Sequence, residues 1–271
     1  MADPTASRPE AGELADAGLR LDVDGPVATV TLNRPERRNA MTFAMWRGLA
    51  RIGESLPEPV RVVVVRGAGP SFSAGIDLSM FERGGAEGGD SFAGAAGDDP
   101  ADAERRIAEL QAGYTWLRRP EIVSIAAVQG HAIGGGFQLA LACDLRVIAD
   151  DARFCMKEAA LGLVPDLTGT KPLVDIVGLP RAIELCLTAR TVHADEAARL
   201  GLAELVVPAA ELDGAVRDLA AALLAVHPGA AVATKRLLRQ APHNTLEQQA
   251  AAERREQVGR LKELFGSGGA A

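Results

Sequence analysis

Residues 130–138 read Gly130-His-Ala-Ile-Gly-Gly-Gly-Phe-Gln138, after an apolar run from Ile122 to Val128 and before a helix-prone segment from Gln138 to Cys143. This order predicts a strand, a glycine turn and a helix. Consecutive glycines let the backbone approach a ligand closely, and the first N–H groups of a helix have no partner within the helix. Such a corner favours an anionic group, although a tight turn that only packs the strand against the helix explains this stretch equally well.

A second glycine corner favours the binding interpretation. The run Arg61-Val-Val-Val-Val-Arg66 is typical of a strand buried on both faces, and Gly67-Ala-Gly-Pro-Ser-Phe-Ser-Ala-Gly-Ile-Asp77 follows it. We therefore expect two buried strands that each end in a loop rich in N–H groups. A dinucleotide-binding fingerprint does not fit, because Phe72 occupies the third glycine position and Pro70 and Ser71 interrupt the helix that should begin there.

Several blocks, taken in their order and spacing, resemble the signature of the crotonase, or enoyl-CoA hydratase/isomerase, superfamily. The blocks are Leu32-Asn-Arg-Pro-Glu-Arg-Arg-Asn-Ala40, Phe72-Ser-Ala-Gly-Ile-Asp77, Ala132-Ile-Gly-Gly-Gly136, Cys143-Asp144-Leu-Arg146, and Lys157-Glu158 followed by Gly162 and Pro165. The resemblance covers nearly all of the chain from about Val27 onward. It implies an α/β fold with a crotonase-like ββα spiral core and an α-helical C-terminal region used for oligomerisation.

The pattern along the chain divides it into three parts. Residues 1–18 combine Pro, Gly and scattered charge without periodicity, so a disordered N-terminal tail is expected. Residues 19–208 alternate strand and helix patterns, starting with a hairpin of Leu19–Val23 and Val27–Leu32, and form the expected spiral core. Residues 209–271 read as helices. The resemblance implies that these helices pack between subunits of a homotrimer or a dimer of trimers, and packing on the chain's own core is the alternative.

Helices are expected at Thr42–Leu56, Ala103–Leu117, Leu212–Val226, Ala230–Leu238 and Thr245–Phe265. Thr245 and Gln248 fit a capping box at the start of the last helix. The glycine and alanine stretch Gly84–Gly97 is expected to be a mobile loop, which by resemblance helps to shape an acyl-binding pocket.

The composition indicates a globular chain with one substantial core, because 48% of its 271 residues are apolar. No run reaches the roughly 18 apolar residues that cross a membrane, and the acidic start has no apolar signal core, so a cytoplasmic protein without membrane contact is expected. Cys143, Cys155 and Cys186 lie far apart in apolar contexts and are expected to be reduced core thiols. No metal-binding cluster is visible, and the resemblance implies no cofactor apart from a coenzyme A thioester bound as substrate.

The formal net charge of −7 argues against nucleic acid as a partner, because a phosphate backbone attracts a basic face. Coenzyme A is also anionic, and the local cluster Arg34, Arg37 and Arg38 is expected to receive its phosphates. A second basic cluster, between Lys235 and Arg239, fits ordinary surface charge slightly better than a phosphate site.

The resemblance implies that the backbone N–H groups of Ile76 and Gly135 form an oxyanion hole for the thioester carbonyl of an acyl-CoA. Two preorganised donors in a dry pocket stabilise an enolate, and one such donor is typically worth about 3 kcal/mol. The expected contacts of the acyl-CoA are Arg34, Arg37, Arg38, Ala40, Ser73, Ala74, Ile76, Asp77, Leu78, Gly134 and Gly135.

Proton transfer requires a carboxylate, and the pattern of acidic residues favours an isomerase. The hydratases of this family use two glutamates, whereas this sequence has Gln138 at the first position and Glu158 at the second. Glutamine orients a water or a substrate but does not exchange a proton as a carboxylate does. Asp166 stands where dienoyl-CoA isomerases of the superfamily place a second proton carrier, although it could instead cap a helix that starts near Gly169. Glu158 is therefore expected to move a double bond as acid and base.

Two alternatives accompany this interpretation. The first is an enoyl-CoA hydratase, and the second is an acyl-CoA-binding protein without catalysis, which would have no need for two retained carboxylates. His131 fits loop packing better than a general base. Ser71 and Ser73 do not indicate a serine peptidase of this fold, because no serine elbow and no triad pattern accompany them.

Overall fold

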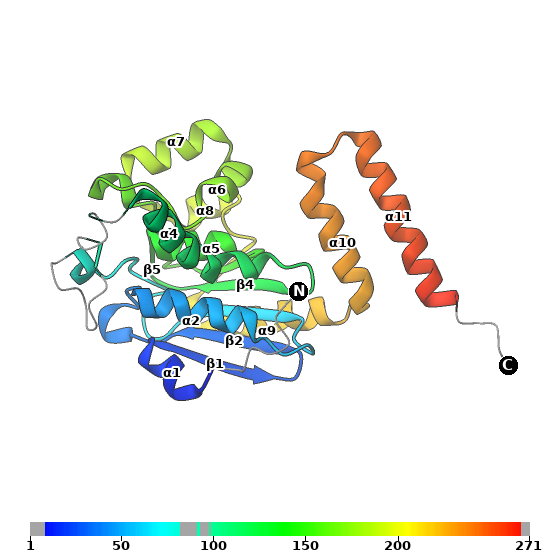
Figure 1. Ribbon diagram of the computed structural model, residues 1–271, viewed down its shortest axis with the longest axis horizontal. Coiled ribbons are helices and arrows are strands. Elements are labelled where there is room, and N and C mark those ends of the chain that lie inside the picture. The colour runs from blue at the N-terminus through cyan, green and yellow to red at the C-terminus, as the bar shows by residue number, and fades with distance from the viewer. Residues whose placement is uncertain (1–8, 82–90, 93–96, 98, 267–271) are drawn as a thin grey trace.

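The computed structural model describes residues 9–81, 91–92, 97 and 99–266, and Figure 1 shows helices packed around a central sheet. A six-stranded sheet has the order β1-β2-β3-β4-β6-β9, and a three-stranded sheet has the order β5-β7-β8. The strands are β1 Leu19–Asp24, β2 Val27–Leu32, β3 Val62–Gly67, β4 Val123–Val128, β5 His131–Ile133, β6 Leu145–Ala149, β7 Arg153–Cys155, β8 Val192–His193 and β9 Leu205–Val207.

Helices of widely different length connect and cover these strands. The α-helices are α1 Ala11–Asp16, α2 Phe43–Glu54, α4 Pro100–Thr115, α5 Gly135–Ala142, α6 Thr170–Val177, α7 Leu179–Thr188, α8 Ala194–Arg199, α9 Leu212–Leu224, α10 Pro228–Gln240 and α11 Leu246–Phe265. The 3₁₀ turns are η1 Pro35–Arg37, η2 Leu78–Phe81, η3 Trp116–Arg118, η4 Glu158–Leu161, η5 Ala209–Glu211 and η6 Ala241–His243.

The opening hairpin and the parallel core strands are confirmed. β1 pairs antiparallel with β2, and β2, β3, β4 and β6 then pair in parallel. In β3, Val63 and Val65 lie in the main core, whereas Val62 and Val64 pack with α9 on the other face. This two-sided burial is why the strand reads as an unbroken β-branched run. Because β3 and β4 are parallel, the loops that follow them leave the same edge of the sheet.

The expected tail over residues 1–18 is wrong in its second half, because α1 forms there. Leu14 is buried in the main core, and Glu13 pairs with Arg51 of α2 at 3.0 Å. A six-residue helix with one buried apolar side chain has too little periodicity to be distinguished from a tail. Residues 1–8, like most of the predicted glycine-rich loop, lie outside the described residues.

The C-terminal region is helical as expected, but only its first helix packs along the sheet. α9 covers the face of the sheet opposite the main core, and α10 and α11 form a hairpin that projects from the body (Figure 1). Thr245 and Gln248 form the predicted capping box, with bonds of 2.8 and 3.2 Å.

Lys235 fastens α10 to the core. Its Nζ donates to Arg119 O at 2.8 Å, to Ile122 O at 2.6 Å and to the Asp144 carboxylate at 2.6 Å. Lys235 therefore has a structural role. It is neither part of a phosphate site nor a solvated surface charge, the two interpretations that the sequence suggested.

The three cysteines are free thiols, and Cys143 and Cys155 are buried. Burial raises the pKa of Cys143 to about 12, so this thiol stays protonated. Among the described residues no single helix is long and apolar enough to cross a membrane; the pair 209–224 and 228–243 meets that test only in combination, with a bend of 102°.

Candidate active site

The two glycine corners lie side by side and pair like strands. Ser73 N donates to His131 O at 2.8 Å, and Ile133 N donates to Ser73 O at 3.0 Å. Gly75 has a φ of +86°, and an added Cβ would lie 2.5 Å from Ile133 O. Glycine is therefore required there both by the backbone conformation and by the close approach of the second loop.

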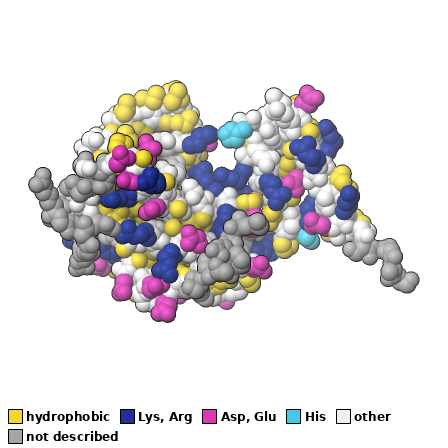
Figure 2. Space-filling view, in the orientation of Figure 1, with side chains coloured by type: hydrophobic (Ala, Val, Ile, Leu, Met, Phe, Trp, Pro, Cys, Tyr) yellow, Lys and Arg dark blue, Asp and Glu magenta, His cyan; other side chains and the backbone are white. Residues whose placement is uncertain are grey.

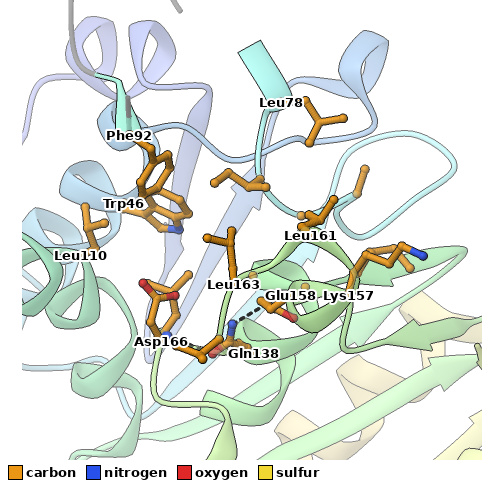
Figure 3. Close-up of a pocket in the computed structure, with 18 of the residues that line it drawn as sticks. Trp46, Leu78, Phe92, Leu110, Gln138, Lys157, Glu158, Leu161, Leu163 and Asp166 are labelled. Carbon is orange, nitrogen blue, oxygen red and sulfur yellow. Dashed lines mark hydrogen bonds between the residues drawn. The ribbon is translucent and has the colours of Figure 1, made fainter. Parts of the chain in front are cut away.

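A cavity of about 460 Å³ opens beside the paired corners (Figure 3). Its side-chain polar groups come from Gln138, Lys157, Glu158 and Asp166. The rest of its wall is apolar and comes mainly from α2, α4, η4 and the segment after η4: Trp46, Ile76, Leu78, Phe92, Ile107, Leu110, Ile133, Leu161, Leu163, Val164 and Leu167. An apolar cleft with a few convergent polar groups is typical of a small-molecule site.

Glu158 is the first residue of η4 and is only 7% exposed. Its Oε1 accepts a hydrogen bond from Gln138 Nε2 at 2.6 Å, and its Oε2 is buried without a partner within the described part of the chain. Burial raises the pKa of Glu158, with a further contribution from Asp166, although hydrogen bonds from the backbone and Gln138 oppose the shift. The carboxyl group is thus suited to exchanging a proton closer to neutral pH than an exposed glutamate.

Gln138 is held in one orientation by the backbone. Its Oε1 accepts from Leu167 N at 2.9 Å and from Gly169 N at 3.1 Å, so its Nε2 must be the group that faces Glu158. Gln138 is 1% exposed and lies in the first turn of α5. It can donate to Glu158, but its oxygen is already occupied by two donors.

Asp166 faces the cavity and does not cap the next helix. The N-cap of α6 is Gly169 and no side chain caps it, so the alternative role for Asp166 as a cap is wrong. Gln111 Nε2 holds this segment by donating to Asp166 O at 2.7 Å. Burial raises the pKa of Asp166. In Figure 3 Gln138 lies between Asp166 and Glu158, so one amide separates two carboxyl groups.

Ile76 and Gly135 both line the cavity, one from each corner. Gly135 is the first residue of α5, where a helical N–H has no partner one turn earlier. Within the described ranges neither backbone N–H donates to another protein group, so both remain available to a ligand. A helix N-terminus also favours negative charge.

The structure brings five of the predicted acyl-CoA contacts to the cavity, namely Ala74, Ile76, Leu78, Gly134 and Gly135. The other six lie outside its lining. Ser73 is fully buried, and its Oγ donates to Asn39 O at 2.7 Å, so it supports the loop.

Arg34 is likewise engaged by the protein. Its guanidinium donates to Ala40 O at 2.6 Å and to the Asp77 carboxylate at 3.0 Å. Burial alone would raise the pKa of Asp77, but hydrogen bonds from Ser79 and Arg34 lower it, so Asp77 is a charged partner of Arg34. Of the basic cluster, Arg37 and Arg38 are exposed beside this pair.

The sequence did not identify Trp46, Ile107 and Leu110 as site residues. They lie on α2 and α4 within ordinary apolar helical patterns, and only the tertiary packing of these helices turns their side chains toward the cavity. Asn39 was also missed as a support. Its Nδ2 donates to Ala68 O and Ser71 O at 2.8 Å each, and its φ of +55° is a conformation that asparagine tolerates.

A family model for enoyl-CoA hydratase/isomerase matches residues 22–263. The chain belongs to this family. A Delta(3,5)-Delta(2,4)-dienoyl-CoA isomerase of Arabidopsis thaliana is 34% identical over 85% of this chain and 83% of its own length. A short-chain-enoyl-CoA hydratase of Clostridium acetobutylicum is 35% identical over 80% of this chain and 79% of its own.

Solved structures have the same fold as this chain. A Thermobifida fusca YX protein in complex with CoA has 59% identity and a TM-score of 0.92, covering 97% of this chain and 100% of that one. The same protein with acetoacetyl-CoA has 60% identity and a TM-score of 0.92, covering 95% and 100%. The crotonase fold is therefore confirmed, and the protein is an enzyme of the hydratase/isomerase kind.

Proposed function

We propose that this enzyme is an enoyl-CoA isomerase that moves a double bond along the acyl chain of a CoA thioester. The observation that carries the proposal is Glu158 Oε2, which is buried without a partner among the described residues, in a cavity where the polar group that bonds this carboxylate is an amide, Gln138. Support also comes from Asp166, which faces the same cavity, and from similarity to a dienoyl-CoA isomerase.

In the proposed reaction Glu158 Oε2 removes a proton from a carbon that the thioester acidifies. The electron pair moves onto the thioester oxygen, where the N–H groups of Ile76 and Gly135 stabilise the enolate. The electrons then return through the conjugated chain, and a carbon further along takes a proton from Glu158 or Asp166. The raised pKa of each carboxyl suits a reversible transfer.

The hydrogen bonds of Gln138 favour isomerisation over hydration. A water that adds to a double bond must be held by an acceptor, and both acceptor positions of Gln138 are taken by Leu167 N and Gly169 N. Hydration remains the second candidate because Glu158 and Asp166 together offer two carboxyl groups, and because a short-chain-enoyl-CoA hydratase is similar to this chain.

Absorbance of the conjugated thioester distinguishes the reactions. The purified enzyme is incubated separately with 2-enoyl-CoA, 3-enoyl-CoA and 3,5-dienoyl-CoA. We expect absorbance to rise with the 3-enoyl or 3,5-dienoyl ester as the double bonds enter conjugation. Loss of absorbance from the 2-enoyl ester alone would establish hydration, and no change with any ester would contradict both candidates.

Matched variants test the assigned base. Glu158→Gln should lower kcat by roughly a thousandfold, within the range for loss of a general acid–base, while the Kd for CoA esters stays within a few-fold. Asp166→Asn should preserve turnover of 3-enoyl-CoA but slow turnover of 3,5-dienoyl-CoA. In the dienoyl ester the carbon that loses a proton and the carbon that gains one lie further apart, so a second carboxyl group is needed. Undiminished turnover by Glu158→Gln would remove this residue from the reaction.

We further propose that the enzyme assembles into a homotrimer or a dimer of trimers through its C-terminal helices. The hairpin of α10 and α11 projects from the body and carries exposed apolar side chains, among them Leu238, Leu246 and Phe265. Apolar area of this kind is stabilised when another subunit covers it.

A further inference from the structure

The N–H of Gly135 lies within three consecutive glycines, Gly134–Gly136, whose backbone carries no side chain to restrict it. The Gly134–Gly135 peptide is held by a bond from Gln138 N to Gly134 O at 2.9 Å, so the next peptide, Gly135–Gly136, is the one that a side chain can fix. An oxyanion donor is effective only when its direction is fixed before the charge develops. In the described part of the chain, the one side chain that hydrogen-bonds this triplet is Tyr114, whose hydroxyl donates to Gly135 O at 3.0 Å.

Tyr114 is itself held rigidly. Its side chain is fully buried, and its hydroxyl oxygen accepts from Trp46 Nε1 at 3.0 Å. Burial raises the pKa of Tyr114, so the group is a neutral phenol with one proton to donate. Met41 Sδ lies 3.3 Å from the same hydroxyl, but a carbonyl is the stronger acceptor and takes that proton.

The position of Tyr114 separates it from the reacting atoms. It does not line the cavity, whereas Gly135 and Trp46 both do. The hydroxyl therefore lies behind the glycine corner, between the Gly135–Gly136 peptide and the indole of Trp46, which forms part of the acyl wall.

We propose that Tyr114 is a positioning residue for the Gly135 N–H. Its bond to Gly135 O fixes the Gly135–Gly136 peptide, and this limits rotation at Gly135, whose N–H belongs to the preceding peptide and faces the thioester oxygen. Trp46 in turn holds Tyr114. This inference rests on the proposed oxyanion hole. It assigns the chain's single tyrosine to a role in catalysis without contact with the substrate.

The test measures the carbonyl itself. Hexanoyl-CoA labelled with ¹³C at the thioester is saturated, so no turnover occurs, and difference infrared spectra give its carbonyl stretch when bound. We expect the wild-type enzyme to lower that frequency relative to water, and Tyr114→Phe to lose most of this lowering. With the reactive ester, kcat of Tyr114→Phe should fall about tenfold, the effect of losing one hydrogen bond, while KM stays within about twofold.

Trp116→Phe is the matched control. It also removes a buried hydrogen bond, from Trp116 Nε1 to Gly113 O at 3.0 Å, but this bond does not reach the glycine triplet. We expect Trp116→Phe to keep the wild-type frequency and kcat. Trp46→Phe keeps an aromatic side chain in the cavity wall but removes the N–H that holds Tyr114. It should reduce the frequency shift and kcat less than Tyr114→Phe does, and it replaces that variant in the test if Tyr114→Phe does not fold.

Three results would overturn the inference in distinguishable ways. Wild-type frequency and kcat in both Tyr114→Phe and Trp46→Phe would exclude a positioning role while leaving the oxyanion hole intact. Equal losses in Trp116→Phe would show a general effect of core disruption. A wild-type enzyme that leaves the frequency unchanged would remove the oxyanion hole itself, and this inference with it.

Discussion

At the scale of single residues, the buried charge of Glu158 opposes folding. Its ordinary pKa is 4.5 and burial raises the pKa in the folded protein. The folded state therefore binds the proton of Glu158 more tightly than the unfolded state does. The stability that the protonated Glu158 contributes is fully present below pH 4.5 and is lost as the pH rises through the pKa of the folded protein. Glu158→Gln should therefore raise the Tm at pH 7, and this increase in Tm should vanish below pH 4.5. Calorimetry at the two pH values measures the difference.

Glu184 offers a control of opposite sign. A hydrogen bond from Arg190 lowers the pKa of Glu184 to about 2, so its contribution is present above the ordinary value and lost in acid. Glu184→Gln should lower Tm at pH 7 and have little effect under strong acid. The same sign of change in both variants at pH 7 would contradict the assignment of a buried carboxyl with a raised pKa at position 158.

Gln138 should control which reaction is possible. In Gln138→Glu the backbone donors of Leu167 and Gly169 would still hold one oxygen, while the other would lie within hydrogen-bond distance of Glu158 Oε1. Two carboxyl groups at that separation share one proton and titrate as a pair. We expect isomerisation at neutral pH to fall about tenfold and 3-hydroxyacyl-CoA to form from 2-enoyl-CoA.

Chromatography of the products measures this change directly. Gln138→Met, which has similar volume and no polar group, should lose isomerisation without any gain of hydration. Hydration at the same rate in both variants would show that the residue at position 138 does not select the reaction.

The residues that the sequence identified are those whose chemistry is local. Gly135 and Glu158 were identified by resemblance, because the triple glycine and the Lys157-Glu158 pair are short blocks that can be recognised at one point of the chain. The roles of Arg34 and Asp77 were predicted differently from what is seen, since a surface arginine and a buried ion pair look alike until the loops are folded together.

At the scale of elements, α10 depends on Lys235 for its attachment to the core. Lys235→Met should destabilise the protein by about 1–3 kcal/mol, because Asp144 and two carbonyl groups lose a partner in a partly buried place. Hydrogen exchange should increase in α10 and α11 more than in the central strands. Urea unfolding of the wild-type protein and of Lys235→Met measures the difference in the free energy of unfolding.

Arg236→Met provides the comparison on the same helix. Arg236 pairs with Glu256 at an exposed site, 2.7 Å away, and such pairs contribute about 0–1 kcal/mol. If the two variants unfold alike, Lys235 has no special part in holding α10.

Elements with a strong local signal were the ones predicted well. β3 and the capped helix α11 follow from burial and from local cap chemistry. α1 was missed because its single buried leucine carries no period. α5 begins at Gly135, three residues before the expected start. Helix propensity disfavours glycine, but it does not include the tertiary contacts with the neighbouring loop that hold these glycines in the helix.

At the scale of the whole molecule, the projecting hairpin predicts the state of assembly. The chain mass is 28.2 kDa, and sedimentation should give about three or six times that value. Leu238→Asp places a charge on an α10 side chain that is 67% exposed in the single chain, and should reduce the mass toward that of one chain.

Gly12→Asp serves as the control for added charge. Gly12 lies on α1, away from the hairpin in Figure 1, and an added Cβ there meets no atom of the described residues within 4 Å. An unchanged mass in Leu238→Asp would place the contact between subunits elsewhere. Figure 2 shows further apolar surface over α7, which the same measurement can probe through Leu187→Asp.

The bonding of the loop around Ser73 to the loop around Ile133 has a consequence for how this enzyme can change over evolution. Residues in such a ladder face alternate sides, so inserting or deleting one residue in either loop would turn every following amide away from its target. Substitutions at outward positions leave that alignment untouched. Changes of loop length should therefore be confined to segments outside the ladder, where new acyl groups can be accommodated without disturbing the donors.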